Sequence, residues 1–98
     1  DVATRPPDLR VAKSVRAGQP LAITTAMRCT LNQAKPVRVL VDLSGTPLAS
    51  VELDPEPGPL PTVEVSVTLP SSGDVAATWI FADGHRQRVV RPVTVKSA

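Results

Sequence analysis

The residues that could act as a general base or a nucleophile are few in this chain of 98 residues. Its one histidine, His85, directly follows the pair Asp83-Gly84, and its one cysteine, Cys29, follows Arg28. Both kinds of catalysis need such a group beside a partner that orients it. We interpret His85 as a solvated hairpin residue. Cys29 is either a small apolar residue at a strand end or a reactive thiol, and we expect no enzyme.

Metal ligands are equally sparse. Glu52, Asp54 and Glu56 alternate and could hold calcium together with loop carbonyls, although a solvated acidic loop is the commoner arrangement. Cys29 and His85 are far apart in sequence, so a site made from both is not expected. We therefore expect no metal and no cofactor.

Three arginines gather near the C-terminus, where they alternate with valines. Cations could steer and orient an acidic protein partner, while the valines supply apolar area. The proposed partner-binding residues are Arg86, Arg88, Val89, Arg91 and Val93. The alternative is that these arginines form a charged edge that prevents a sheet from pairing with a second chain. A net charge of +2 and 2% aromatic residues argue against nucleic acid as the partner, and no apolar run is long enough for a membrane span.

Hydrophobic residues alternate with polar ones along most of the chain, as in half-buried strands. The eleven prolines argue against long helices. Residues 1–8 have no such period and are interpreted as a leader or linker before one domain, residues 9–98. Residues 29–36 are expected to form a loop, and residues 54–61 an extended connection between sheets. The expected strands cover residues 9–15, 21–28, 37–43, 48–53, 62–69, 75–82 and 85–95.

The strand from Val75 to Ala82 is apolar on both faces, so it should be central, with Trp79 buried. The following Asp83-Gly84 pair predicts a hairpin with a type I′ turn. Pro92 places the last strand at a sheet edge or a bulge. Seven short strands with turns every eight to twelve residues predict an all-β fold, an immunoglobulin-like β-sandwich of about seven antiparallel strands.

Two stretches resemble a known family. The run LRVAKSVRAGQPLAITT, residues 9–25, is similar to the opening of SoxZ, the immunoglobulin-like subunit of the bacterial sulfur-oxidation carrier complex. The run LPSSGDVAATWIFADGHRQRVVRPVTV, residues 69–95, is similar to the end of that family. Residues 26–30 depart from the family, which has a His-Pro-Met-Glu-Thr-Gly-like segment in that place.

The resemblance implies a periplasmic or extracellular, non-enzymatic scaffold subunit that forms a heterodimer with a carrier subunit. In that family the partner bears the sulfur substrate on a cysteine-containing arm. Since no cysteine lies near Ala98, this chain would be the supporting subunit. The alternative interpretation is an immunoglobulin-like accessory or spacer domain of a larger secreted or multi-domain protein.

Overall fold

The computed structural model describes residues 7–28, 34–53 and 61–97, which fold into eight strands and no helix. The valine-rich, period-two runs form strands because branched side chains pack well on a pleated surface. The strands are β1 (Asp8–Val11), β2 (Ser14–Arg16), β3 (Leu21–Ala26), β4 (Pro36–Leu43), β5 (Thr46–Glu52), β6 (Thr62–Val67), β7 (Gly73–Phe81) and β8 (Arg86–Lys96).

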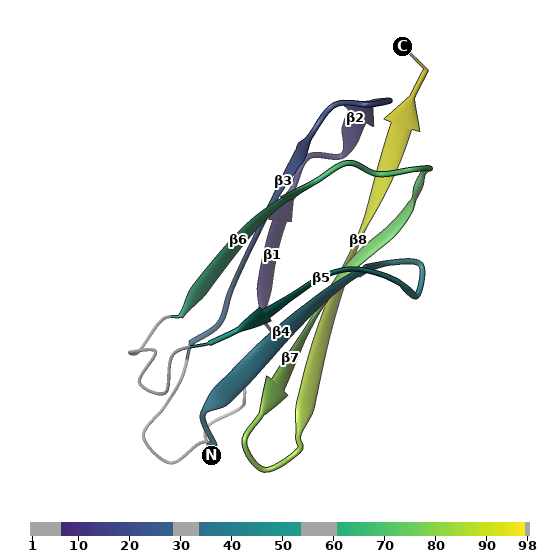
Figure 1. The fold of residues 1–98 in the computed structure, drawn as a ribbon. Helices are drawn as coiled ribbons and strands as arrows, with labels where there is room; N and C mark the ends of the chain where they lie inside the picture. The colour runs from purple at the N-terminus through teal and green to yellow at the C-terminus, as the bar shows by residue number, and fades with distance from the viewer. Residues whose placement is uncertain (1–6, 29–33, 54–60, 98) are drawn as a thin grey trace.

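Two sheets face each other across the core (Figure 1). The smaller sheet has the strand order β1-β3-β6, and the larger has the order β2-β8-β7-β4-β5. All neighbours pair antiparallel except β2 and β8, which run parallel. The expected all-β architecture of two packed sheets is therefore confirmed.

The opening strand is divided between the two sheets. The sequence predicts one strand over residues 9–15, but β1 pairs with β3 in the smaller sheet and β2 pairs with β8 in the larger. The chain crosses between the sheets at Ala12 and Lys13. This division accounts for the eighth strand, and it leaves β2 in contact with only the last part of β8.

The core consists of aliphatic side chains packed around Trp79, which is fully buried as expected. The indole Nε1 of Trp79 on β7 donates a hydrogen bond to Thr25 Oγ1 on β3, at 2.9 Å, and Thr25 Oγ1 donates to the carbonyl oxygen of Asp8 at 2.7 Å. These two bonds join three strands and both sheets through the core. They also satisfy polar groups that would be costly to bury alone.

β7 lies in the middle of the larger sheet, and both of its faces are covered, as predicted. On its outer face, Ala76 is fully buried and Thr78 is 8% exposed. The cover comes from neighbouring strands: Arg88 on β8 makes two hydrogen bonds to Asp42 on β4, at 3.0 and 3.4 Å, across β7. Side chains of the neighbouring strands β8 and β4 thus cover the outer face of β7, in place of a further sheet or helix.

The turn between β7 and β8 differs from the sequence interpretation. Asp83-Gly84 does close a hairpin, but Gly84 has a φ of +89° while Asp83 has no positive φ, so the predicted type I′ turn is wrong. Gly84 N instead donates to the carbonyl of Phe81, which is typical of a type I turn followed by a glycine bulge. The type I′ dihedrals occur at Ser44-Gly45, whose φ values are 49° and 92°.

Several expected boundaries shift or lie outside the described residues. β1 begins at Asp8, which the sequence analysis placed in the leader, and residues 1–6 are not described. Of the expected loop at 29–36, residues 29–33 are outside the described ranges and Pro36 is the first residue of β4. Most of the expected connection at 54–61 is likewise outside them.

Candidate partner-binding edge

β8 pairs with β7 from Arg86 to Val93, and with β2 only at Thr94–Lys96. In an antiparallel pair, successive residues direct their backbone N–H and C=O groups alternately toward and away from the neighbouring strand. Thr94 N donates to Lys13 O, and Ala17 N donates to Lys96 O, so even-numbered residues of β8 face the β2 side. From Arg86 to Pro92, that side of β8 is not paired with any described strand.

We call residues 86–92 the free edge of β8. By the same alternation, the N–H groups of Arg86, Arg88 and Val90 point out of the sheet there. Pro92 has no N–H, and it lies on the part of β8 that β2 does not pair with, where a missing donor is tolerated as at an edge. The guanidinium Nη1 of Arg91 folds back and donates to the carbonyl oxygen of Val90 at 2.9 Å. One backbone acceptor of the free edge is therefore covered by a side chain of the same strand.

The structure does not bring the five proposed partner-binding residues onto one surface. Val89 and Val93 are 9% and 3% exposed and belong to the core. Arg86 and Arg88 are exposed on the outer face of the larger sheet, where Arg88 is ion-paired with Asp42. Arg91 is exposed beside β1. Among the described residues the three arginines are thus exposed, but these two valines are not.

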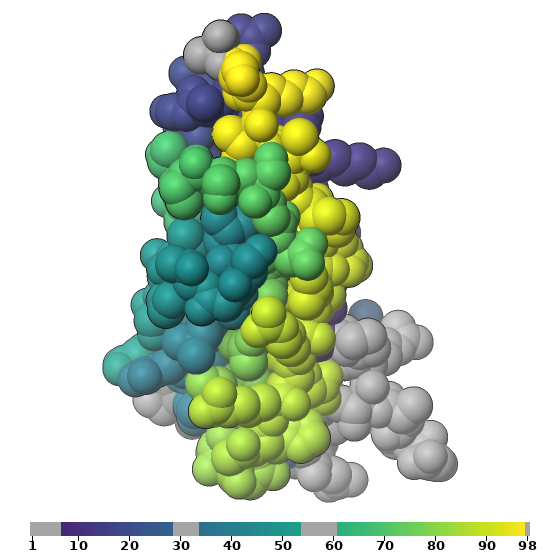
Figure 2. Space-filling view, turned by 90° about the vertical axis from the view of Figure 1, so that its right-hand side faces the viewer, coloured from purple at the N-terminus to yellow at the C-terminus, as the bar shows by residue number. Residues whose placement is uncertain are grey.

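A groove opens between the two sheets at the upper end of the free edge, where β1 passes β8. In Figure 2 purple residues from the N-terminal part of the chain lie beside the yellow part of β8. The groove has a volume of about 560 Å³. We call it the β1–β8 groove; its lining residues are Leu9, Arg10, Val11, Lys13, Arg91, Pro92 and Thr94.

Three of these lining residues are cations, and none is an acid. Arg10 also holds the carboxylate of Asp8 at 3.2 Å, while Lys13 and Arg91 have no carboxylate partner among the described residues. Sequence reasoning missed Arg10 and Lys13, because nothing in a period-two pattern says which strands border one another. The split of the opening strand, which brings them beside β8, has no visible sequence signal.

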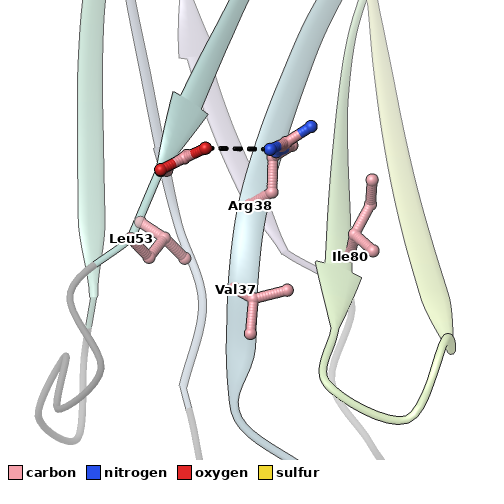
Figure 3. A pocket seen from close by; sticks show the side chains of 5 residues that line it. Val37, Arg38, Leu53 and Ile80 are labelled. Atoms are coloured by element: carbon pink, nitrogen blue, oxygen red, sulfur yellow. Dashed lines mark hydrogen bonds and ion pairs between the residues drawn. The ribbon is translucent and has the colours of Figure 1, made fainter.

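A second, shallower pocket of about 380 Å³ lies on the outer face of the larger sheet (Figure 3). Val37, Leu53 and Ile80 form its apolar part, and Val37 is 43% exposed. An ion pair at its rim joins Arg38 Nη2 to Glu52 Oε1 at 2.9 Å. Glu52, the first of the three candidate calcium ligands, is thus paired with Arg38. The other two expected ligands, Asp54 and Glu56, are outside the described residues.

The residues whose types could act in catalysis are not assembled into a site in the described part of the chain. His85 is exposed, as expected, and its ring contacts Phe81 edge-to-face with centroids 5.3 Å apart. Cys29 lies outside the described residues. No group of three or more His, Cys, Asp or Glu side chains there could hold a metal ion. No described helix is long and apolar enough to cross a membrane.

No protein-family model matches the chain, and no characterised protein matches it by sequence. Its fold does match solved structures. A superoxide reductase (neelaredoxin) from Ignicoccus hospitalis is 17% identical with a TM-score of 0.78, covering 95% of this chain and 82% of that one. A Thermotoga maritima protein described as a candidate superoxide reductase is 15% identical, with a TM-score of 0.71 and coverages of 92% and 85%. A Listeria innocua β-glucosidase contains the fold as 16% of its chain, with a TM-score of 0.59.

These matches correct three expectations. The resemblance to SoxZ is wrong, since the fold is that of the superoxide reductases over almost the whole chain. The scaffold function in sulfur oxidation, with its heterodimer, is therefore wrong as well, and the spacer alternative gains no support. The expectation of a non-enzyme is also wrong as it stands, because the neighbours that share this fold are enzymes by name.

The residues present do not fit a redox metal. Reducing superoxide takes one electron, and transition-metal centres that supply one are usually held by several His or Cys ligands. The whole chain contains one of each, and the described residues contain no cluster of three ligands. We therefore derive no chemical step through a metal at this fold.

Proposed function

We propose that the chain is a protein-binding β-sandwich domain that docks an extended, acidic segment of a partner against the free edge of β8. The observation that carries the proposal is that β2 covers β8 only at Thr94–Lys96, so that no described strand pairs with the outward N–H groups of Arg86, Arg88 and Val90. An added strand gains affinity from backbone hydrogen bonds at such an edge.

Charge supports an acidic partner. Arg86 and Arg91 stand at the two ends of the free edge, and neither has a carboxylate partner among the described ion pairs. Cations placed this way attract negative chains and repel a second copy that presents the same edge. Arg88 contributes less, because Asp42 already holds it. The partner strand would displace the Arg91 side chain from Val90 O and offer a carboxylate in exchange.

The test uses the intact chain and an acetylated peptide of alternating valine and glutamate. We expect the amide signals of Arg86, Arg88 and Val90 to shift on titration, with an affinity that falls as salt is added. Shifts confined to the Val37–Leu53 hairpin would place the interface elsewhere and defeat the proposal.

One matched pair of variants isolates the backbone contribution. Val90→Pro removes an outward N–H that β7 does not use, just as the native Pro92 lacks one, so the fold should survive. Val90→Thr keeps the N–H and a branched side chain. We expect the proline variant to lose peptide binding and the threonine variant to keep it. Equal binding by both folded variants would show that no strand is added at β8.

We also propose that the sandwich is immunoglobulin-like. The first strand is shared between the sheets, β2 runs parallel to the last strand, and consecutive hairpins alternate with crossings between sheets. These features support a Greek-key sandwich of that class. An experimental structure checks the proposal, and a β1 paired only with β8 would contradict it.

A redox activity is the second candidate, favoured by the fold match with superoxide reductases over 92–95% of the chain. It is tested by measuring the metal content of the chain purified from iron-supplemented cells and its consumption of superoxide. About one bound metal per chain, with consumption that depends on it, would support the activity. A chain that holds no metal and consumes none above the blank would exclude it.

A further inference from the structure

The β1–β8 groove bears on how a docked segment must end, and this inference rests on the docking proposed for β8. Any strand added along the free edge is collinear with β2, which occupies the next positions of the same edge from Thr94 onward. Such a strand cannot continue past Pro92 toward Thr94 without colliding with Lys13 and Ser14. It must therefore turn away or end at the groove.

The charges at that point distinguish between the two ends of a chain. Arg10, Lys13 and Arg91 line the groove, and Asp8 is held by Arg10. An incoming strand that ran antiparallel to β8 would bring its amino end among these cations, where like charges repel. A strand that ran parallel to β8, as β2 does, would bring its carboxyl end there. Opposite charge then adds to the backbone pairing.

The remaining lining of the groove is mainly apolar and comes from Leu9, Val11 and Pro92. An aliphatic side chain next to the terminal carboxylate would be partly removed from water by Val11 and Pro92, while Leu9, which is 3% exposed, lies beneath them in the core. Apolar walls with a few convergent charged groups are the usual make-up of a pocket that fixes one chain end.

We infer that the β1–β8 groove binds the free C-terminal carboxylate of a partner whose last residues lie along β8, parallel to it, and end in an aliphatic residue. Lys13 and Arg91 supply the charge, Arg10 shares its charge with Asp8, and β2 sets the point where the partner ends.

The experiment compares two peptides of the same sequence, acetyl-Glu-Val-Thr-Val-Val, one with a free carboxyl end and one amidated. Binding is followed by amide shifts of the intact chain at low salt. We expect amidation to weaken binding at least about fivefold, which is the order of effect of one charge-assisted contact near a surface. Equal affinities for the two peptides would overturn this inference and leave the edge docking intact.

Two variants separate the groove from the rest of the edge. Lys13→Ala should lower affinity for the free-acid peptide toward that of the amide and leave the amide unchanged. Arg86→Ala, at the far end of the free edge, should weaken both peptides alike. Loss of affinity for both peptides in Lys13→Ala would contradict a role specific to the carboxylate.

Direction is tested with a spin label at the amino end of the free-acid peptide. The label should broaden signals near Arg86 and spare those of Lys13 and Thr94. Broadening centred on Lys13 would show an antiparallel strand and overturn the inference. If neither peptide binds at millimolar concentration, the docking on β8 itself fails, which is a different result from equal binding by both.

Discussion

At the scale of single residues, the hydroxyl of Thr25 holds the two sheets in register. It accepts a hydrogen bond from Trp79 Nε1 and donates one to the carbonyl oxygen of Asp8. Thr25 is 1% exposed. A core with one tryptophan and one phenylalanine has few large side chains to fix how the sheets face each other. A directional bond through the middle supplies specificity that small aliphatic residues lack.

Thr25→Val is the test of this bond, because it keeps the shape and leaves the indole N–H and the Asp8 carbonyl without their partner. We expect a loss of about 1–3 kcal/mol in the free energy of unfolding, measured with urea. In a Trp79→Phe background the same change should cost less, since no indole N–H is then stranded. Equal costs in both backgrounds would show that the bond contributes nothing.

The side chain of Arg88 covers the outer face of β7 with its stem as well as with its charge. Arg88→Met should therefore cost less stability than Arg88→Ala, because the methionine still covers Ala76 and Thr78. The ion pair with Asp42 is half-exposed on the arginine side, so its own contribution should stay below about 1 kcal/mol. Thermal unfolding of both variants measures the difference, and equal losses would assign the effect to charge alone.

At the scale of elements, the hairpin between β7 and β8 determines where the free edge starts. Asp83 Oδ1 accepts from His85 N at 2.9 Å, and Gly84 takes up the left-handed conformation. A type I′ turn would require positive φ at both residues, whereas here only the glycine has it.

Asp83→Gly distinguishes these turns. A type I′ turn would tolerate or favour glycine at that position, but in this structure the change removes a hydrogen bond and adds backbone freedom. We expect a loss of about 1–2 kcal/mol in urea unfolding. Asp83→Asn, which keeps an oxygen acceptor, is the control and should cost far less. A stabilised glycine variant would restore the type I′ interpretation.

The sequence predicted the elements better than the arrangement between them. Alternation located the strands, and the double apolar face of Val75–Ala82 identified the central strand, because both follow from local side-chain periodicity. Pro92 lies on the part of β8 that β2 does not pair with, as expected from its missing N–H. The split of the opening strand and the groove beside Arg91 depend on contacts between residues far apart in the chain. The apparent likeness to SoxZ failed because strand–turn–strand patterns recur in unrelated sandwiches.

At the scale of the whole molecule, the two sheets form an elongated body of 47 × 25 × 20 Å in which β8 spans most of the length. A free edge of that kind invites pairing with further copies. Arg91 covers Val90 O, Pro92 removes a donor, and Arg86 adds charge. These three features disfavour pairing between the β8 edges of two copies of this chain. The same features leave the edge open to a strand that brings carboxylates.

Replacing Arg86 and Arg91 tests whether these two side chains keep the edge of β8 from pairing with a second copy. The double variant Arg86→Val/Arg91→Val exposes Val90 O and removes the repulsion between copies, so we expect concentration-dependent dimers or larger species in sedimentation velocity. Arg38→Val is the matched control, because it adds similar apolar surface on β4, which lies between β7 and β5 and is not an edge strand. It should leave the association state of the wild type unchanged. A double variant that sediments like the wild type at all concentrations would show that the edge of β8 is closed by something other than its charge.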